Sequence, residues 1–157
     1  MNLPYGVTGF YNSTIDKPHE IDDRPFKDIC FNLTRKYQGR ILDMDESKLA
    51  TNFFKVKINI NHQDLYVLLN MYYPFLTFAS DLEFQRLQFI DHPVLSKDFM
   101  PFYKVLSKDE LSSPLKIRKR KGQITLENIN KLNTTELEQI LYWQPKNVGE
   151  VIFNFWD

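Results

Sequence analysis

The densest group of side chains that could perform chemistry is a run of cations near residue 120. Five of the six residues from 116 to 121 are lysine or arginine, and Gly122 follows them. A run of this density can bind phosphate groups or an acidic protein surface. The candidate partner-binding patch consists of Lys116, Arg118, Lys119, Arg120 and Lys121.

Three interpretations of this basic run stay open: a solvated hairpin or loop, a docking site for an acidic protein, and a contact with nucleic acid. In a strand, successive side chains alternate between two faces. Lys116, Arg118 and Arg120 would then lie on one face and Lys119 and Lys121 on the other. The chain carries 20 Lys+Arg and 20 Asp+Glu residues. This neutral balance produces no overall attraction to a polyanion, so it weighs against nucleic acid.

Other groups with catalytic or metal-binding potential are scattered. Asp43, Asp45 and Glu46 could share a hard cation, but their stretch lacks the mid-loop glycine and terminal glutamate of an EF-hand. A solvated loop is the simpler interpretation. The three histidines stand singly in polar surroundings that are typical of turns. An enzyme site assembled only by folding would have to draw on Asp43, Asp45, His62 and His92.

Motifs for nucleotide binding and nucleophilic catalysis are missing from the sequence. The five glycines are dispersed, so neither a P-loop nor a dinucleotide fingerprint can be written, and no Gly-x-Ser-x-Gly elbow occurs. Cys30 is the only cysteine, which excludes an intramolecular disulfide and a cysteine-based zinc site. Its apolar neighbours favour a buried, unreactive thiol. We therefore expect no catalytic residue, cofactor or metal.

Length and composition indicate a single globular domain over residues 1–157. Hydrophobic residues make up 43% of the chain and aromatic residues 15%, so the core should be built largely from rings. No signal-peptide pattern occurs at the start, and no apolar run approaches the roughly 20 residues of a membrane span. We expect a cytoplasmic protein without a membrane partner. The abundance of Lys, Asn, Ile, Phe and Tyr suggests an AT-rich genome, such as that of a low-GC bacterium.

The elements that would position these groups form an α+β set with an antiparallel sheet. Apolar residues at helical spacing, between Pro25 and Gly39, predict an N-terminal helix over about 25–38. Strict alternation from Phe54, a break at 61–64 and an apolar run to Tyr73 predict a central hairpin over about 52–73. A capping-box pattern at 133–136 and apolar spacing near the end predict helices over about 134–143 and 146–156.

The remaining segments give weaker patterns. Residues 1–24 predict an irregular segment. Residues 75–79 favour a short strand, and 84–90 fit neither periodicity well. The prolines between 92 and 114 argue against long regular elements there, with an edge strand possible over 102–106.

The closing stretch Tyr142–Asp157 resembles the terminal segment of small low-GC bacterial proteins of the immunity type that accompany polymorphic toxins. The resemblance covers sixteen residues and includes no functional motif, so it implies no site residues. It implies a non-enzymatic protein that neutralises a cognate toxin by binding it. We therefore expect a protein-binding module, and the alternative is a nucleic-acid-associated accessory protein that uses residues 116–121.

Overall fold

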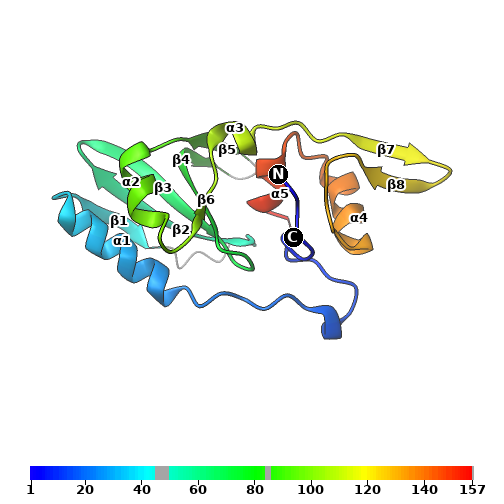
Figure 1. Ribbon diagram of the computed structural model, residues 1–157, viewed down its shortest axis with the longest axis horizontal. Coiled ribbons are helices and arrows are strands. Elements are labelled where there is room, and N and C mark those ends of the chain that lie inside the picture. Colours follow the sequence, from blue (N-terminus) through cyan, green and yellow to red (C-terminus); the bar gives the residue numbers. More distant parts are fainter. Residues whose placement is uncertain (45–49, 84–85, 157) are drawn as a thin grey trace.

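The computed structural model describes residues 1–44, 50–83 and 86–156. Helices and a mostly antiparallel sheet occur together, which confirms the predicted α+β class (Figure 1). The elements in chain order are η1 (Thr14–Asp16), α1 (Arg24–Lys36), β1 (Arg40–Met44), β2 (Phe53–Ile60), β3 (Gln63–Asn70), β4 (Phe75–Glu83), β5 (Arg86–Ile90), α2 (Pro93–Phe99), β6 (Lys104–Val105), α3 (Lys108–Leu111), β7 (Ile117–Arg120), β8 (Gln123–Leu126), α4 (Thr134–Trp143) and α5 (Val148–Ile152).

The main sheet has the strand order β1-β2-β3-β4-β5, and each neighbouring pair in that order is antiparallel. β6 adds a short parallel pairing with the start of β4. β2 and β3 pair continuously from Phe53 opposite Asn70 to Ile60 opposite Gln63. The predicted hairpin over 52–73 is therefore confirmed, and its second strand is the middle strand of the five.

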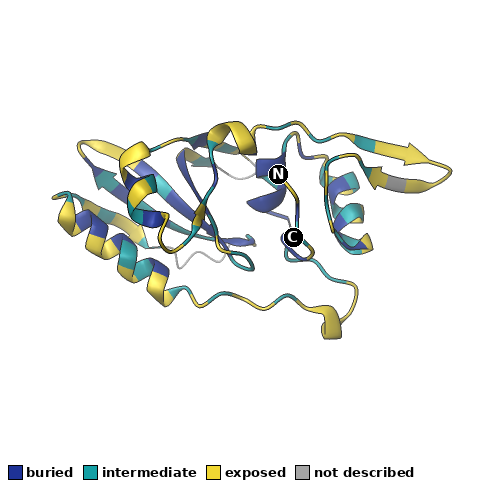
Figure 2. Cartoon of the chain, viewed as in Figure 1, coloured by how far each residue is buried: buried dark blue, intermediate teal, exposed yellow. Residues whose placement is uncertain are grey.

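Each face of the sheet has its own core. On one face, Leu65, Val67 and Leu69 of β3 pack with buried residues of α1 and α2. On the other face, Leu68 packs in a core that also contains Phe153 and residues of the N-terminal segment. Because both faces are covered, β3 has an unbroken apolar run from Leu65 to Leu69, as expected for a strand buried on both sides (Figure 2).

α1 confirms the predicted N-terminal helix and ends at Lys36. Pro25 occupies the first turn, where a backbone N–H would have no partner within the helix. Phe26, Cys30 and Leu33 form its buried face. Cys30 is 1% exposed, and burial raises the pKa of its thiol, which matches the expected buried cysteine.

The sequence correctly predicts the end of α1, and the structure adds the reason. Gln38 has a positive φ of 55° and turns the chain out of the helix. A Cβ atom on Gly39 would lie 2.1 Å from the carbonyl oxygen of Asn59 on β2. Glycine is thus required here by the close approach of two backbones, which lets the chain enter β1 directly.

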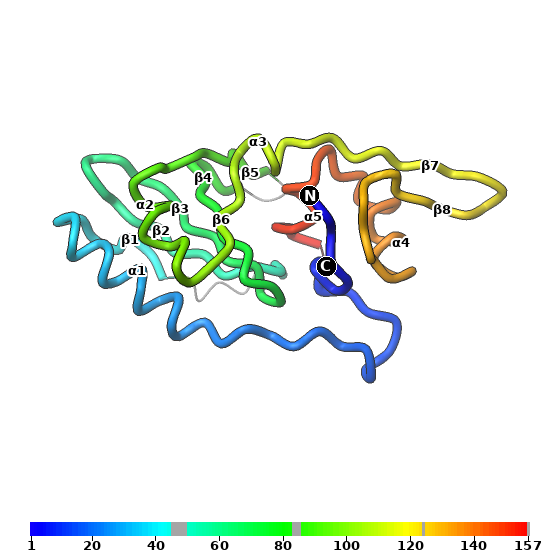
Figure 3. The backbone as a smooth tube through the Cα atoms, viewed as in Figure 1, coloured from blue at the N-terminus to red at the C-terminus, as the bar shows by residue number. Residues whose placement is uncertain are grey.

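The N-terminal segment, expected to be irregular over 1–24, contains only η1, a bridge between Leu3 and Asn130, and the first residue of α1. Figure 3 shows it passing from the middle of the molecule, beside the C-terminal end, to the start of α1. The side-chain amides of Asn52 and Asn70 each donate to the carbonyl oxygens of Val7 and Ile152, at 2.7 to 3.0 Å. These buried hydrogen bonds join both chain ends to the base of the β2–β3 hairpin.

The first C-terminal helix is confirmed and the second is shorter than predicted. α4 spans Thr134–Trp143 and begins with the expected capping box of Asn133 and Glu136. The predicted helix over 146–156 is wrong beyond Ile152, because α5 ends there and Phe153 is extended, with φ −123° and ψ 96°. Tertiary contacts replace the helical hydrogen bonds: Asn154 donates its backbone N–H to Asn52 and its amide to the carbonyl of Thr8. The apolar residues of this tail are still buried.

The middle of the chain contains more regular structure than its sequence pattern indicates. The short strand predicted over 75–79 extends to Glu83 as β4, and the ambiguous stretch 84–90 contains β5. The predicted edge strand over 102–106 is the two-residue β6. A helix that the sequence pattern does not predict, α2, begins at Pro93 and is capped by His92, whose Nδ1 accepts from the backbone N–H of Leu95 at 3.2 Å.

Candidate functional site

The basic run folds into a second hairpin, which we call the basic hairpin (residues 116–127). β7 and β8 pair from Ile117 opposite Leu126 to Arg120 opposite Gln123. The turn consists of Lys121 and Gly122, with positive φ angles of 48° and 76°. Two consecutive residues with positive φ are typical of type I′ turns, whose twist matches that of the flanking strands. The basic run therefore has the local structure of a solvated hairpin, which is the first of the three interpretations.

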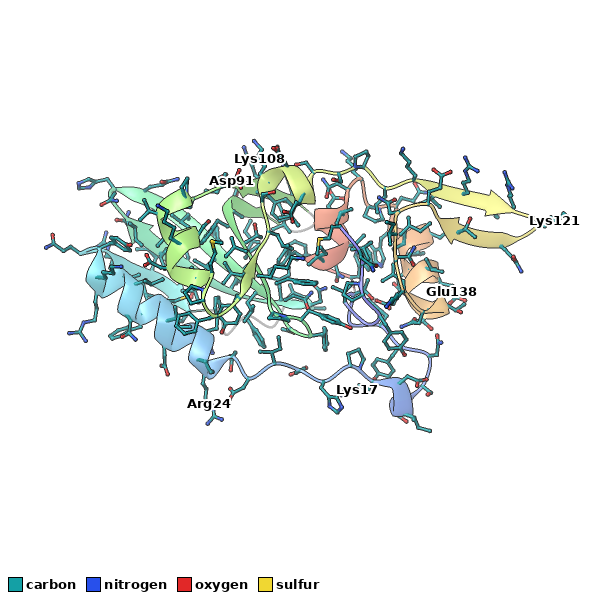
Figure 4. All side chains as sticks on the ribbon, viewed as in Figure 1. Lys17, Arg24, Asp91, Lys108, Lys121 and Glu138 are labelled. Atoms are coloured by element: carbon teal, nitrogen blue, oxygen red, sulfur yellow. The ribbon has the colours of Figure 1, made fainter. Side chains whose placement is uncertain are left out.

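The base of the basic hairpin is tied to the rest of the chain. Ile117 and Leu126 pack at the edge of the core that contains Phe153. The side chain of Asn128 joins both strands, because its Oδ1 accepts from the N–H of Lys116 at 2.9 Å and its amide donates to the carbonyl of Pro114 at 3.1 Å. Beyond this base the ribbon projects away from the other elements, with Lys121 at its far tip (Figure 4).

The two faces of the basic hairpin differ. Opposite residues in an antiparallel pair point to the same side. Arg118 and Arg120 therefore share one face with Thr125 and Gln123, while Lys119 shares the other with Ile117. For residues 118–120 this agrees with the alternation expected from the sequence, whereas Lys116 precedes β7 and Lys121 lies in the turn. Arg118 forms an ion pair with Glu127, and it is the one cation of the run with an acidic partner among the residues described.

The basic hairpin also separates charge within a neutral chain. Residues 116–127 contain five cations and one anion, a net charge of +4. The rest of the chain therefore contains 15 cations and 19 anions, a net charge of −4. Residues 118–121 are all exposed. The zero net charge of the whole molecule conceals a strongly positive projection on a negative body.

The loop after β8 and the helix α4 each present an exposed apolar side chain. Ile129 follows β8 by three residues and is 73% exposed. Tyr142 lies in α4, which packs against β8, and is 78% exposed. The sequence pattern does not single out either residue as part of a binding surface. Tyr142 falls in a predicted helix whose apolar spacing indicates packing, and only the structure shows which side of that helix faces solvent.

The scattered acidic and histidine candidates that the structure describes lie on separate elements. Asp43 lies on the edge strand β1, His62 in the exposed turn between β2 and β3, and His92 at the start of α2. Asp45 and Glu46 lie outside the described residues. Within 1–44, 50–83 and 86–156, no group of three His, Cys, Asp or Glu side chains could hold a metal ion.

Among the helices of the described chain, none has the length and apolar character needed to cross a membrane. Comparison of the chain with protein-family models, with curated proteins and with solved structures gave no match.

Proposed function

We propose that the protein is a non-enzymatic binding module that docks an acidic surface of a protein partner through the basic hairpin. In the immunity-type version of this proposal, the partner is a cognate toxin that is neutralised by the contact. The observation that supports it is the projecting ribbon, which carries four cations without an acidic partner in the described part of the chain. When such cations pair with carboxylates of a partner in a buried interface, the pairs fix the orientation of the partner and make the interface specific.

The surroundings of the ribbon favour protein over nucleic acid. Protein interfaces combine arginine with exposed aromatic and apolar anchors. Arg118 and Arg120 on the ribbon, with Ile129 and Tyr142 on the adjoining elements, supply that combination. The rest of the chain has a net charge of −4. It therefore repels any part of a polyanion that extends beyond the ribbon.

The test is co-expression of the tagged protein with the products of adjacent genes, followed by size exclusion. The informative variant is Arg120→Glu/Lys121→Glu, which reverses the tip of the ribbon. Its matched control is Lys17→Glu/Lys97→Glu, two exposed lysines elsewhere on the molecule with the same change of net charge. Figure 4 shows how far Lys17 lies from Lys121.

We expect the hairpin variant to lose the complex and the control to keep it. Equal loss in both variants would show that net charge, and not the basic hairpin, governs the association. A stable complex that survives reversal of the tip would overturn the proposal for this surface.

A second candidate function is nucleic-acid association through the same ribbon. The specific observation is its shape, because a two-stranded β-ribbon fits the major groove of a duplex. Four cations that each neutralise one phosphate would give a slope of about −3.6 in a plot of log affinity against log salt. Fluorescence anisotropy with a labelled duplex and its single strand measures that slope. Absence of binding at low salt would end this alternative.

A further inference from the structure

A cavity of about 510 Å³ lies between the end of α4, the C-terminal tail and β5. We call it the aromatic cavity, because four of the described residues that line it are Trp143, Phe153, Phe155 and Trp156. Its volume is within the range of pockets that hold small organic ligands. Aromatic side chains give such a pocket flat apolar faces on which another ring can stack.

The charges around the aromatic cavity favour no ion. Lys146 and Glu150 both line it, and their opposite charges cancel. Arg86 also lines it, but this side chain already interacts with a partner within the protein. A charged ligand would lose hydration on entering and would meet no net opposite charge among these residues in return. The lining therefore favours a neutral molecule.

Trp156 supplies an unused hydrogen-bond donor. Its side chain is 8% exposed, and its indole N–H has no acceptor among the described residues. The indole N–H of Trp143, by contrast, donates to Gln139 Oε1 at 3.0 Å. No fully buried side-chain nitrogen of the described chain lacks a partner, so the N–H of Trp156 opens onto accessible space. A ligand that carries an acceptor would satisfy this donor.

The size of the space beside Trp156 indicates which cavity would hold that ligand. Trp156 also lines a second cavity of about 130 Å³, together with Phe10 and Tyr72. Phe10 packs against Trp156 there, with the ring centroids 6.4 Å apart. The second cavity is smaller than the pockets that hold organic ligands, whereas the aromatic cavity has the required volume.

The walls of the aromatic cavity are held by contacts within the protein. Gln144 adopts a left-handed conformation, with φ 50° and ψ 58°, and turns the chain out of α4. The backbone N–H of Lys146 then donates to Glu150 Oε2 at 2.7 Å. In the tail, the backbone N–H of Asn154 donates to Asn52 Oδ1 at 2.7 Å. A ligand would therefore meet a preformed site and lose little free energy to ordering it.

We propose that the aromatic cavity binds a neutral, planar aromatic molecule that carries a hydrogen-bond acceptor. The ring of this ligand stacks against Trp143, and its acceptor receives the indole N–H of Trp156. Burial of the ring supplies the affinity, and the hydrogen bond selects among rings of the same shape. This inference is independent of the proposed function, because it uses none of the residues of the basic hairpin.

Quinoline and naphthalene are matched probes, because the two molecules have the same shape and quinoline adds one acceptor nitrogen. N-methylquinolinium and naphthalene-2-carboxylate are their charged counterparts. The chain has two tryptophans, so nitrogen-edited NMR follows both indole N–H signals during titration. At a pH where quinoline is neutral, we expect it to bind saturably and about fivefold more tightly than naphthalene, as one neutral hydrogen bond predicts. The Trp156 signal should move downfield with quinoline, and both ions should bind more weakly.

The variant that tests stacking is Trp143→Ala, and its control is Tyr142→Ala, the exposed neighbour in α4. We expect quinoline to bind about tenfold more weakly to the first variant and normally to the second. Trp143 packs at the edge of a core, so Trp143→Leu, which keeps apolar volume there, gives the same test if the alanine variant does not fold. Lys146→Gln should leave quinoline binding unchanged, because the ligand is neutral.

Three results would each overturn the proposal: no saturable binding of quinoline, equal affinity for quinoline and naphthalene or an unmoved Trp156 signal, and tighter binding of either ion. The hairpin variant Arg120→Glu/Lys121→Glu should bind quinoline normally. Failure of the proposed function would therefore leave this site intact, and failure of this site would leave the proposed function intact.

Discussion

The molecule contains two hairpins with similar turns and opposite surroundings. Asn61 and His62 connect β2 to β3 with φ angles of 53° and 64°, and Lys121 and Gly122 connect β7 to β8 with 48° and 76°. β2 and β3 are buried between two cores, whereas among the described side chains of β7 and β8 Ile117 and Leu126, at the base, contact one core. The turn is therefore a local feature, and the side chains on the strands decide whether a hairpin is scaffold or a surface for binding.

The largest expected difference between the hairpins is in global stability. Leu68 in β3 is fully buried, so Leu68→Ala removes packed methyl groups and leaves a cavity. We expect a loss of about 2–5 kcal/mol in the free energy of unfolding. The matched change in the basic hairpin is Lys119→Ala, at an exposed position, with an expected change under about 0.5 kcal/mol. Urea denaturation followed by circular dichroism measures the free energy of unfolding of both variants. Similar losses in the two would contradict the expected difference between the hairpins.

The sequence predicts the central hairpin well because one physical signal dominates there. Strict alternation in β2 and an unbroken apolar run in β3 each have a single structural solution once both faces are covered. The same holds for α4, whose capping box fixes its first residue. The end of α5 is different. Its apolar spacing fits a helix as far as Trp156, but Asn154 gains hydrogen bonds to Asn52 and Thr8 that local sequence cannot reveal.

The sequence likewise predicts only part of the structure of the basic run. Its alternation predicts the faces of Arg118, Lys119 and Arg120 correctly, since the strand period is a local property. The projection of the ribbon, the bond from Asn128 that closes its base, and the exposure of Tyr142 depend on how distant segments pack. The cavity of about 510 Å³ lined by Leu87, Trp143 and Phe155 needs β5, the end of α4 and the C-terminal tail together, so no spacing within one segment could indicate it.

The second prediction concerns α4, which packs against β8 and holds the N-terminal segment. Glu136 is completely buried and accepts from Gly6 at 2.7 Å and from Thr8 and Asn133. In Glu136→Gln, an amide group replaces one oxygen and leaves at least two buried donors without an acceptor. We expect a loss of about 1–3 kcal/mol. Thermal unfolding measures the loss, and limited proteolysis within residues 1–24 should become faster.

The control for this change is Glu138→Gln, two residues further along α4. Glu138 is exposed (Figure 4), so the same chemical substitution should leave both unfolding and proteolysis unchanged. Equal effects at 136 and 138 would mean that the buried hydrogen bonds do not hold the N-terminal segment.

A smaller effect is expected from the turn of the basic hairpin. Gly122 has φ +76°, and no atom lies within 4 Å of the position that a Cβ atom would take there. Gly122→Ala therefore meets no steric contact and changes only the backbone energy, at a local cost of about 1 kcal/mol. Because the ribbon is exposed, this cost should appear as faster amide exchange in β7 and β8. Exchange in β2 and β3 should not change, and acceleration there would show that the two hairpins open together.

The smallest effect on stability is expected from Arg120→Glu/Lys121→Glu, the variant that should abolish partner binding. Both side chains are exposed and contact no acidic group in the described chain. New carboxylates beside Arg118 and Lys119 would replace repulsion with attraction, so unfolding should change by less than about 0.5 kcal/mol, toward higher stability. Urea unfolding at low and physiological salt tests this, because the small gain should fade as salt screens it. A loss above about 1 kcal/mol would mean that these cations support the fold, and the basic hairpin would then be a second scaffold and not a surface kept for a partner.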